Sequence, residues 1–472
     1  MNKKTKIICT IGPSSEDYKT ILAMANEGMN VARLNFSHGS HEEHQARIDL
    51  IRKVEKENNV TISVMLDTKG PEIRLGEFKN HEEEYKIGDI VTVCKEEVLG
   101  THDRFCIRCP ELFNDIKPGN YILINDGKQR LDVIENNGEE LKCKVMVDGK
   151  LSSNKGCNVP GVKLSMPFLS EKDRKDIEFG CDNNVDFIAA SFVRRKEDVF
   201  AIKDILLSKG KPKISIIAKI ENEEGFKNLE DILEVADGAM VARGDLGVEV
   251  STSLVPLYQK KIIQTANKHG KCVITATHML DSMTNNPRCT RAEASDVCNA
   301  VLDGSDAVML SAETAAGKYP VEAVSTMAKI AYETEKIFPY QEHHERMVKE
   351  KNGYSIQDAI GLSIAETSLS LNISAIVIFT QGGSTAKIIS KCRPTCPIYA
   401  ATFTQETVHR LNCYYGVTAS LSPAQNEMTN DDELASQICL KMGHKKGEHI
   451  ILSAGYPTGE GTCNMMKIVE IK

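Results

Sequence analysis

Three polar residues at alternate positions are the feature of this sequence that points most directly to chemistry. Arg33, Asn35 and Ser37 are separated by Leu34 and Phe36. Because successive side chains of a strand point to opposite faces, Leu34 and Phe36 share a face that can pack beneath a helix. The other face then carries a guanidinium, an amide and a hydroxyl. A strand that gathers such groups at its end is typical of one that builds a site.

The same arrangement recurs in short apolar runs that end in charged or hydroxyl side chains. The runs are 7–11, 31–37, 63–66, 187–192, 214–218, 239–242, 272–274 and 307–310. The polar residues at their ends are Asp67, Thr68 and Lys69, Arg194, Lys219 and Glu221, Arg243 and Asp245, Thr275 and Thr277, and Ser311 and Glu313. Nearly continuous apolar strands are expected in a parallel sheet that is covered on both faces.

Helix signals lie between these strands. Ser170 with Asp173 forms a capping-box pattern and Gly180 a helix stop, while Pro256 and Pro320 suit first helical positions. Eight strand–helix units predict an α/β fold, the closed (β/α)₈ TIM barrel, which takes roughly 250 residues. Active sites of that fold lie at the C-terminal strand ends, where the polar residues collect, so we expect a barrel enzyme.

One interval, from Lys69 to Asp186, is too long for a single helix. It contains candidate strands at 90–93, 105–107, 121–124 and 141–145, separated by Gly- and Asn-containing turns. This pattern predicts an inserted β-barrel domain that lies over the barrel as a lid.

The remainder of the chain predicts a third domain. Residues 339–352 are expected to form a polar, charged connector. Helices are expected at 355–371, 384–392, 404–413 and 430–442, and strands at 375–379, 397–401, 449–453 and 465–471. The predicted domains are a TIM barrel (1–70 and 168–340), a lid (71–167) and a C-terminal α/β domain with an open sheet (341–472).

Bulk properties narrow the function class. The 472 residues carry a net charge of −8 with both signs interspersed, so nucleic-acid and membrane partners are not expected. No apolar run is long enough to span a bilayer, and the start of the chain lacks a signal-peptide core. Fifteen cysteines, an odd number, indicate reduced thiols and a cytoplasmic protein. Cys106 and Cys109 lack a second pair, which favours core cysteines over a zinc half-site.

A metal-assisted phosphoryl site can be assembled from the strand ends. Glu221 and Asp245 follow neighbouring strands, whose backbones lie ~4.8 Å apart, so both carboxylates could hold one Mg²⁺. Lys219 and Arg33 add two cations, and this combination suits the dispersed charge of a transferring phosphoryl group. The competing interpretation is a structural ion-pair network. Four polar strand ends at the catalytic face favour a site.

A second cluster has a softer charge. Asp67 and Thr68 with Asn35 and Ser37 offer one carboxylate, an amide, hydroxyls and a carbonyl, which suit a monovalent cation. A hydrogen-bonded polar core remains the alternative.

Two further features concern substrate handling. Thr277, with Ser311 and Glu313, could relay a proton. Gly244 offers an unobstructed backbone N–H at a turn into a helix, which can hold a carboxylate or phosphate.

Several long motifs resemble the pyruvate kinase family. They are the runs 66–74, 189–194, 217–222, 240–247, 291–297 and 311–314. The order and size of the domains also match, and the similarity is to bacterial members without an additional C-terminal domain. The resemblance implies transfer of a phosphoryl group from phosphoenolpyruvate to ADP, giving pyruvate and ATP at the end of glycolysis. It also implies Mg²⁺ (or Mn²⁺) and K⁺ as cofactors, and a homotetramer.

The resemblance further implies roles for individual residues. Glu221 and Asp245 would hold Mg²⁺, while Lys219 would stabilise the phosphoryl group and Arg33 would hold it from the other side. The substrate would also contact Gly244, Asp245, Thr277, Ser311 and Glu313, with Thr277 on the path that protonates the enolate. Potassium ligands would be Asn35, Ser37, Asp67 and Thr68. The nucleotide side would be Asn35, His38, Arg74 and Lys155. Glu72 matches the potassium-dependent members.

Two positions depart from the family pattern. His278 stands where Gln is usual, and Ala312 replaces a common Gly. Neither change removes a charged catalytic group, so activity is expected, while proton delivery at Thr277 stays open.

A possible effector loop lies in the third domain. Thr380, Gly382, Gly383, Ser384 and Thr385 follow an apolar strand and open a helix, which is phosphate-binding geometry. An ordinary turn is an equal alternative on the residues alone. The resemblance favours a sugar-phosphate or nucleotide effector. Tyr415 stands where several fructose-bisphosphate-activated relatives have Trp, and the segment 456–461 lacks an Arg that some use, so the effector's identity stays open.

Two other functions compete with phosphoryl transfer. A metal-dependent enolate lyase or aldolase of the phosphoenolpyruvate–pyruvate barrel group shares a Glu/Asp metal pair, but it has no need for the lid with Lys155 or for the potassium-like cluster. A non-catalytic phosphometabolite sensor would be favoured by loss of Lys219, Glu221, Asp245 or Arg33. All four residues are present, so phosphoryl transfer is preferred.

Overall fold

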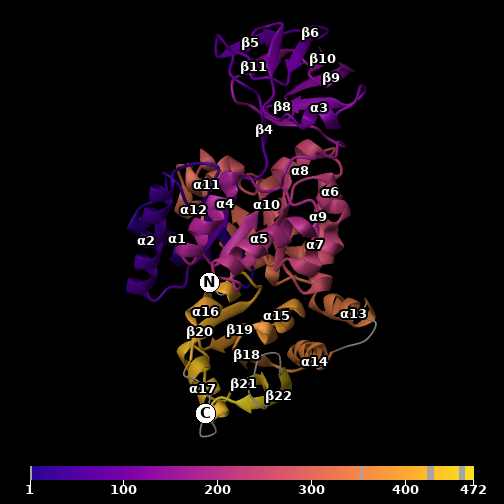
Figure 1. The fold of residues 1–472 in the computed structure, drawn as a ribbon. Coiled ribbons are helices and arrows are strands. Elements are labelled where there is room, and N and C mark those ends of the chain that lie inside the picture. Colours follow the sequence, from indigo (N-terminus) through magenta and orange to yellow (C-terminus); the bar gives the residue numbers. More distant parts are fainter. Residues whose placement is uncertain (1–2, 351–354, 423–429, 456–462) are drawn as a thin grey trace.

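The computed structural model describes residues 3–350, 355–422, 430–455 and 463–472. Three parts are stacked along one axis, with the lid at one end, the TIM barrel in the middle and the C-terminal domain at the other end (Figure 1). Among the described residues, no helix is both long and apolar enough to cross a membrane.

The barrel strands are those predicted from the apolar runs. They are β1 (Lys6–Thr10), β2 (Val31–Asn35), β3 (Ser63–Asp67), β13 (Phe187–Ala190), β14 (Ser215–Ile220), β15 (Gly238–Ala242), β16 (Cys272–Ala276) and β17 (Ala307–Leu310). They pair in parallel in the closed order β1-β17-β16-β15-β14-β13-β3-β2. The predicted TIM barrel is confirmed.

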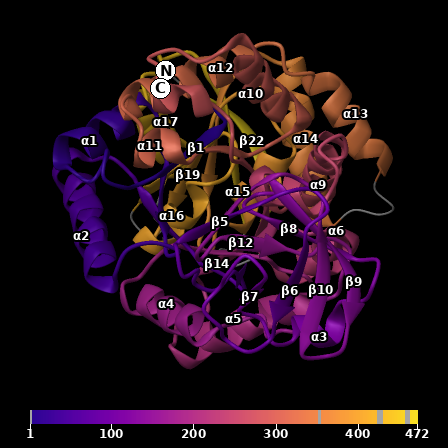
Figure 2. The same cartoon turned by 90° about the horizontal axis from the view of Figure 1, so that it is seen from above.

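Each barrel strand is followed along the chain by a helix of the outer ring. The ring helices are α1 (Tyr18–Glu27), α2 (His41–Asn58), α4 (Glu171–Asp182), α5 (Lys196–Ser208), α7 (Leu229–Val235), α9 (Val255–His269), α10 (Arg291–Asp303) and α12 (Pro320–Glu335). The view from above shows helices such as α1, α2, α4, α5 and α9 around the outside of the molecule (Figure 2). Short helices lie near the carboxyl ends of the strands: α6 (Glu223–Lys227), α8 (Arg243–Glu249), the 3₁₀ helix Asp281–Thr284 and α11 (Ala312–Ala315).

The capping box of Ser170 and Asp173 is confirmed, but Gly180 does not end the helix. It lies inside α4, where a Cβ atom would come within 2.8 Å of Leu66 Cδ1. This glycine therefore allows the helix to pack closely on β3.

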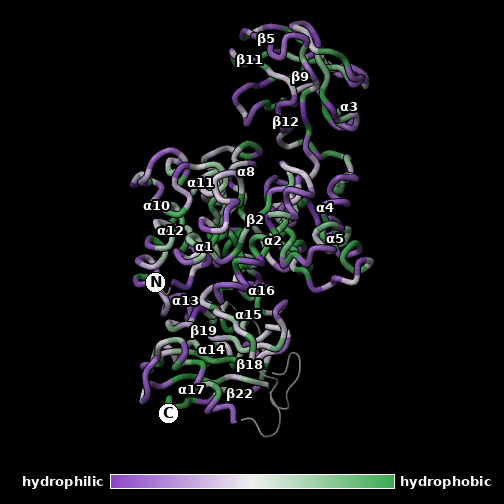
Figure 3. Tube along the Cα trace, turned by 90° about the vertical axis from the view of Figure 1, so that its left-hand side faces the viewer, coloured by the Kyte–Doolittle hydropathy of each residue, from purple (hydrophilic) through white to green (hydrophobic). Residues whose placement is uncertain are grey.

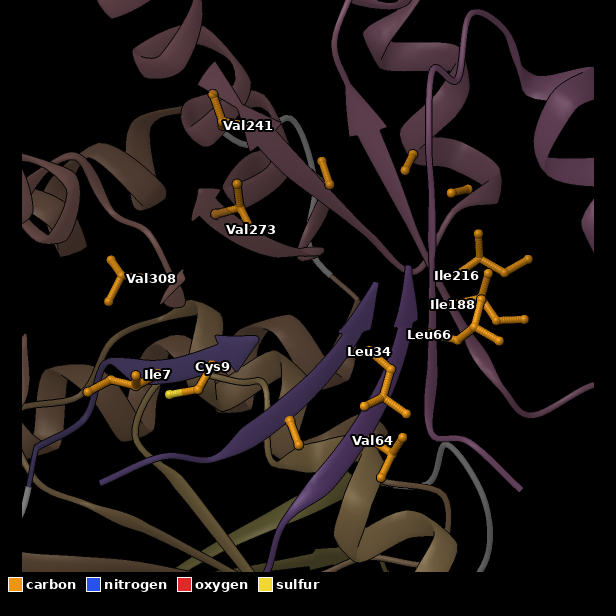
Figure 4. Packing of buried hydrophobic residues seen from close by; sticks show 14 of the residues in the cluster. Ile7, Cys9, Leu34, Val64, Leu66, Ile188, Ile216, Val241, Val273 and Val308 are labelled. Atoms are coloured by element: carbon orange, nitrogen blue, oxygen red, sulfur yellow. The ribbon is translucent and has the colours of Figure 1, made fainter. Parts of the chain in front are cut away.

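Strand alternation divides the barrel into two hydrophobic layers. Ile7, Leu34, Val64, Ile188 and Val241 belong to the layer that packs against the helices (Figure 4). Their neighbours on the strands, including Ile8, Val31, Met65, Ile217 and Met240, form the inner layer. The inner layer is continuous with the core of the C-terminal domain, which therefore sits against the barrel end opposite to the lid. Hydrophobic segments lie mainly inside the barrel and the C-terminal domain (Figure 3).

The lid is a β domain, as predicted, but it has more strands than the sequence suggested. A seven-stranded sheet has the order β4-β12-β8-β9-β10-β6-β7, and β11 pairs with β5. The bounds are β4 (Ile73–Arg74), β5 (Glu82–Tyr85), β6 (Ile90–Cys94), β7 (Arg104–Cys106), β8 (Tyr121–Ile124), β9 (Gln129–Asn136), β10 (Glu140–Val145), β11 (Gly149–Ser152) and β12 (Gly156–Asn158), with helix α3 (Leu112–Asp115). Cys106 and Cys109 are both buried in this domain, and Cys109 belongs to its hydrophobic core.

The C-terminal domain has the expected open sheet, in the order β20-β19-β18-β21-β22. Its elements are α14 (Ile356–Ser370), β18 (Ile373–Phe379), α15 (Ser384–Lys391), β19 (Ile398–Thr402), α16 (Gln405–Leu411), β20 (Val417–Leu421), α17 (Asp431–Lys441), β21 (His449–Gly455) and β22 (Cys463–Glu470). Strand β20 was not predicted.

The expected polar connector at 339–352 contains helix α13 (Tyr340–Glu350), which was not predicted, and residues 351 and 352 lie outside the described part of the chain. The buried face of this helix includes His343 and His344, with Met347 packed on a small cluster beside it.

Candidate active site

Part of the predicted chemical residues, with Ser191 in addition, gather at the carboxyl ends of four strands that are neighbours in the barrel: β2, β3, β13 and β14. Four side chains face the barrel interior because each lies two positions after an apolar residue of the inner layer. They are Arg33, Asp67, Ser191 and Lys219. Strand pairing places Asn35 opposite Asp67. The alternation pattern therefore identified the residues that the fold brings together.

A buried carboxylate lies between two cations at the centre of this cluster. Arg33 Nε donates to Asp67 Oδ2 over 2.6 Å, and Lys219 Nζ donates to Asp67 Oδ1 over 3.0 Å. Lys219 Nζ also lies 3.0 Å from Glu221 Oε1. Asp67 and Glu221 are fully buried, and the two basic side chains are each only 11% exposed. The cluster holds two basic and two acidic side chains out of water.

The charges of this cluster support one another. Burial alone would raise the pKa of Asp67, but Arg33 and Lys219 outweigh it and hold that pKa below its ordinary value. Burial alone would lower the pKa of Lys219, but the Asp67 and Glu221 carboxylates raise it above its ordinary value. Lys219 is therefore a permanent cation at neutral pH.

Two hydroxyl residues that the sequence analysis had not assigned hold these cations in place. Lys219 Nζ donates to Ser191 Oγ over 2.7 Å, and Arg33 Nη1 donates to Thr10 Oγ1 over 2.9 Å. The alternation of side chains along β1 and β13 places Thr10 and Ser191 on the inward face. This alternation was the sequence signal that could have identified both residues. Thr10 in turn donates to the Leu310 carbonyl over 3.0 Å, which fixes its orientation.

Glu221 has the character of a metal ligand. Its Oε2 accepts from the Phe192 N–H over 2.6 Å. Its buried Oε1 has no hydrogen-bond partner among the described residues, because Lys219 approaches it without hydrogen-bond geometry. Burial raises the pKa of Glu221 to about 7, Lys219 opposes this, and the Asp245 carboxylate adds to it. Asp245 is exposed in the first turn of α8. Two neighbouring carboxylates, one with an unsatisfied buried oxygen, fit a divalent cation.

Thr277 lies in an unusual turn after β16. Thr277 and His278 both have left-handed backbone conformations, with φ of 66° and 53°. The Thr277 hydroxyl donates to the Ala276 carbonyl over 2.7 Å and accepts from the Gly244 N–H over 2.8 Å. The Gly244 amide is thus engaged by Thr277 rather than free to bind a ligand.

Ser311 and Glu313 differ in availability. Glu313 accepts from the Ser311 N–H over 2.7 Å and from the Leu280 N–H over 3.0 Å, so its carboxylate holds the backbone around the site. The Ser311 hydroxyl is buried, and no described residue forms a hydrogen bond with it. Ala312, the departure from the family pattern, is exposed at the start of α11.

The residues predicted to bind K⁺ lie together, and their oxygens also have other hydrogen-bond partners. Asn35 Oδ1 accepts from the Ser37 N–H over 3.1 Å, and the Thr68 carbonyl accepts from Ser191 Oγ over 2.6 Å. The Asp67 carboxylate is shared with the two cations described above. The donor set consists of oxygens with one formal charge, which fits a monovalent cation.

A cleft of about 680 Å³ separates the lid from the barrel. Its lining includes Arg74 and Lys155 from the lid and Asp245 from the barrel. Arg74 is held by Glu72 Oε2 over 2.8 Å and by the Asn154 carbonyl over 2.8 Å. His38, by contrast, does not line this cleft; it is exposed just before α2.

The loop of the third domain has the predicted strand–turn–helix form. It joins β18 to α15; Gly383, with φ of 86°, donates its N–H to Thr380 Oγ1 over 3.1 Å. Arg410 Nη2 lies 3.5 Å from the Gly382 carbonyl, and Arg410 Nε is buried without a hydrogen-bond partner in the part of the chain that the structure describes.

Tyr415 is buried away from this loop, 4.0 Å below the Arg393 guanidinium at the boundary with the barrel. The segment 456–461 lies outside the described residues.

Comparisons with known proteins agree with this geometry. The family model described as "Pyruvate kinase, barrel domain" matches residues 2–324, and "Pyruvate kinase, alpha/beta domain" matches residues 358–469. Pyruvate kinases from Staphylococcus aureus strains MRSA252 and USA300 are each 50% identical over 470 residues, covering 99% of this chain and 80% of theirs. A crystal structure of a pyruvate kinase from Cryptosporidium parvum has a TM-score of 0.96 at 36% identity, covering 100% of this chain and 97% of that one.

The chain belongs to the pyruvate kinase family. Its activity is the transfer of the phosphoryl group of phosphoenolpyruvate to ADP, giving pyruvate and ATP. The enolate lyase and the non-catalytic sensor considered from the sequence are therefore set aside.

Proposed function

We propose that the cluster of Arg33, Asp67, Lys219 and Glu221 is the place where the phosphoryl group passes from phosphoenolpyruvate to ADP. The observation that carries this proposal is the pair of buried cations, Arg33 and Lys219, fixed on opposite oxygens of Asp67. Preorganised charge stabilises a dispersed-charge transition state without reorganisation at the moment of reaction. Because Lys219 stays protonated, it acts as a fixed positive charge and not as an acid.

Glu221 and Asp245 would hold Mg²⁺ or Mn²⁺. When bound, such an ion supplies positive charge to the phosphoryl oxygens and orients the substrate. The buried, unsatisfied Glu221 Oε1 and the exposure of Asp245 to the lid cleft support this role. Asn35, Ser37, Asp67 and Thr68 would hold K⁺.

Proton delivery to the enolate would involve the hydroxyls of Thr277 and Ser311. Glu313 orients the backbone that carries Ser311, since both of its oxygens accept backbone N–H groups. Gly244 would contribute through its contact with Thr277, by setting where the hydroxyl points.

ADP would enter the cleft between lid and barrel, where Arg74 and Lys155 present positive charge to its phosphates. Asn35 and His38 both lie outside the cleft lining, so each would reach the nucleotide only from beyond it. In the C-terminal domain, Thr380 to Thr385 would bind the phosphate of a sugar-phosphate or nucleotide effector. A homotetramer in the cytoplasm is proposed on the family resemblance.

The metal assignment is tested by Glu221→Gln and Asp245→Asn. Each removes one formal charge while keeping the side-chain shape, so phosphoryl transfer should be abolished and Mn²⁺ binding, measured by electron paramagnetic resonance, should weaken. Glu223→Gln is the matched control, because Glu223 lines the same cleft but pairs with Lys227. Near wild-type turnover and unchanged metal binding in either ligand variant would contradict the assignment.

A further inference from the structure

Arg243 lies beside the site, and no step of the mechanism above uses it. It is the first residue of α8 and immediately precedes Gly244 and Asp245. Its guanidinium is only 11% exposed and is directed at the end of the neighbouring strand β16. A buried cation at this place needs a reason beyond solubility.

The guanidinium holds the carbonyls that bound the Thr277 turn. Nη2 donates to the Thr277 carbonyl over 2.6 Å, and Nε lies 3.2 Å from the same oxygen and 3.3 Å from the Ala276 carbonyl. Two consecutive non-glycine residues in left-handed conformations cost energy and persist only where surrounding contacts impose them. Arg243 supplies such contacts to this turn.

The other end of the fork anchors Arg243 to the helix ring. Nη1 lies 2.7 Å from Asp296 Oδ2 in α10 and 3.3 Å from Gln259 Oε1 in α9. The planar guanidinium can bond both the carbonyls and the carboxylate at once, whereas a lysine ammonium is a single point charge.

Thr277 is consequently held from two sides by consecutive residues of α8. Arg243 binds its carbonyl, and the Gly244 N–H binds its hydroxyl over 2.8 Å. Asp245, the next residue, is the proposed metal ligand. The distance between the Thr277 hydroxyl and the metal-binding end of α8 is therefore fixed by one short segment.

We infer that Arg243 is a positioning residue that sets the Thr277 hydroxyl for proton transfer to the enolate. This inference rests on the proposed role of Thr277. Loss of the guanidinium fork releases the turn toward an ordinary backbone conformation and displaces the hydroxyl, while the charges that bind the phosphoryl group stay in place. Displacements of about 1 Å at a reacting group cost up to roughly a hundredfold in rate.

The test uses four proteins: wild type, Arg243→Lys, Thr277→Val and the double variant. Exchange of pyruvate methyl protons in D₂O is followed by NMR with Mg²⁺, K⁺ and ATP, and phosphoryl transfer by a coupled assay. Arg243→Lys should slow the exchange roughly tenfold or more and lower kcat more than it changes KM for phosphoenolpyruvate. In the Thr277→Val background the same substitution should cause little further loss.

Controls separate positioning from general stability. Arg47 of α2 pairs with Glu16, and Arg47→Lys should leave the proton exchange unchanged. If Arg243→Lys folds poorly, Asp296→Asn loosens the anchor of the guanidinium and should give the same pattern in weaker form. Melting temperatures of all variants are recorded alongside the rates.

The outcomes are distinguishable. Two results would overturn this inference but leave the proposed role of Thr277 intact. In the first, the rate losses of the two substitutions multiply in the double variant. In the second, Thr277→Val exchanges slowly while Arg243→Lys exchanges at the wild-type rate. Wild-type exchange by Thr277→Val would overturn the proposed role of Thr277 and, with it, this inference.

Discussion

A histidine ties the C-terminal domain to the barrel, and its charge should make that junction depend on pH. His409 of α16 is 7% exposed; its Nε2 lies 2.6 Å from Glu55 Oε1 of α2 and its Nδ1 3.1 Å from Asp186 Oδ1, just before β13. Arg52 binds the same two carboxylates, at 3.1 and 2.9 Å. Gln405 Nε2 and Arg52 Nη1 also lie near His409 Nε2, at 2.9 and 3.5 Å. The charges of the Glu55 and Asp186 carboxylates are neutralised by Arg52 and His409 only when the imidazole is protonated.

The magnitude follows from the pKa of this group. Burial would lower the pKa of His409, but the hydrogen bonds with Asp186 and Glu55 outweigh it and raise the pKa from 6.5 to about 9. Because the folded pKa lies above the unfolded one, this stabilisation is fully present below about pH 6.5 and is lost as the pH rises through about 9. The gap corresponds to about 3 kcal/mol of folding free energy.

The assay is the difference in unfolding free energy between wild type and His409→Gln, measured by urea unfolding from about pH 6.5 to about pH 10. The difference in unfolding free energy should be largest near pH 6.5. It should decrease toward pH 10 by most of the about 3 kcal/mol derived above. Other titrating groups near the junction, such as Lys6, act on both proteins and cancel. His102→Gln, at an exposed histidine of the lid, should show no such change. A difference that stays constant over the whole range would refute the reasoning.

Other predictions concern ions and the effector. Activity should rise steeply with K⁺ and fall in Na⁺ or Li⁺, and Glu72→Lys should partly relieve the requirement; full activity in buffer free of K⁺ and Na⁺ would count against it. Because Glu72 also holds Arg74, the KM for ADP must be measured separately. Ser384→Asp should place a negative charge where an effector phosphate would bind. It should abolish the drop in half-saturating phosphoenolpyruvate caused by sugar phosphates or nucleoside monophosphates, with the saturated rate unchanged. A wild type that responds to none of them, or a variant that responds equally, would make the loop an ordinary turn.

The barrel and the gathering of these polar side chains at one end of it were predictable from the alternation of side chains along each strand. The alternation that places Leu34 and Phe36 outward forces Arg33 and Asn35 inward, and the same parity applies to Lys219 and Glu221. Neighbouring parallel strands then bring these residues together, whatever the intervening helices contain. The lid strands were harder where polar residues outnumber apolar ones, as in β9, which buries only Leu131 and Val133.

Other features lack a sequence signal for physical reasons. The buried face of α13 includes His343, whose pKa burial lowers to about 3, so a nominally polar residue serves as core. Strand β20 lies at the edge of its sheet and buries only Val417. The turn at Thr277 and His278 has left-handed conformations without glycine, so residue types did not reveal the contacts of Arg243.

The central claim is that Lys219 is the fixed cation of phosphoryl transfer, and Lys219→Met tests it most directly. Two rates are measured on one preparation: ATP formation from phosphoenolpyruvate and ADP, and exchange of pyruvate methyl protons with solvent. The account predicts that ATP formation is lost, because the transition state loses several kcal/mol of stabilisation. Proton exchange is retained, since in this account enolisation depends on Glu221, Asp245 and Thr277. Equal loss of both rates would contradict the account and reduce Lys219 to an organiser of the metal site.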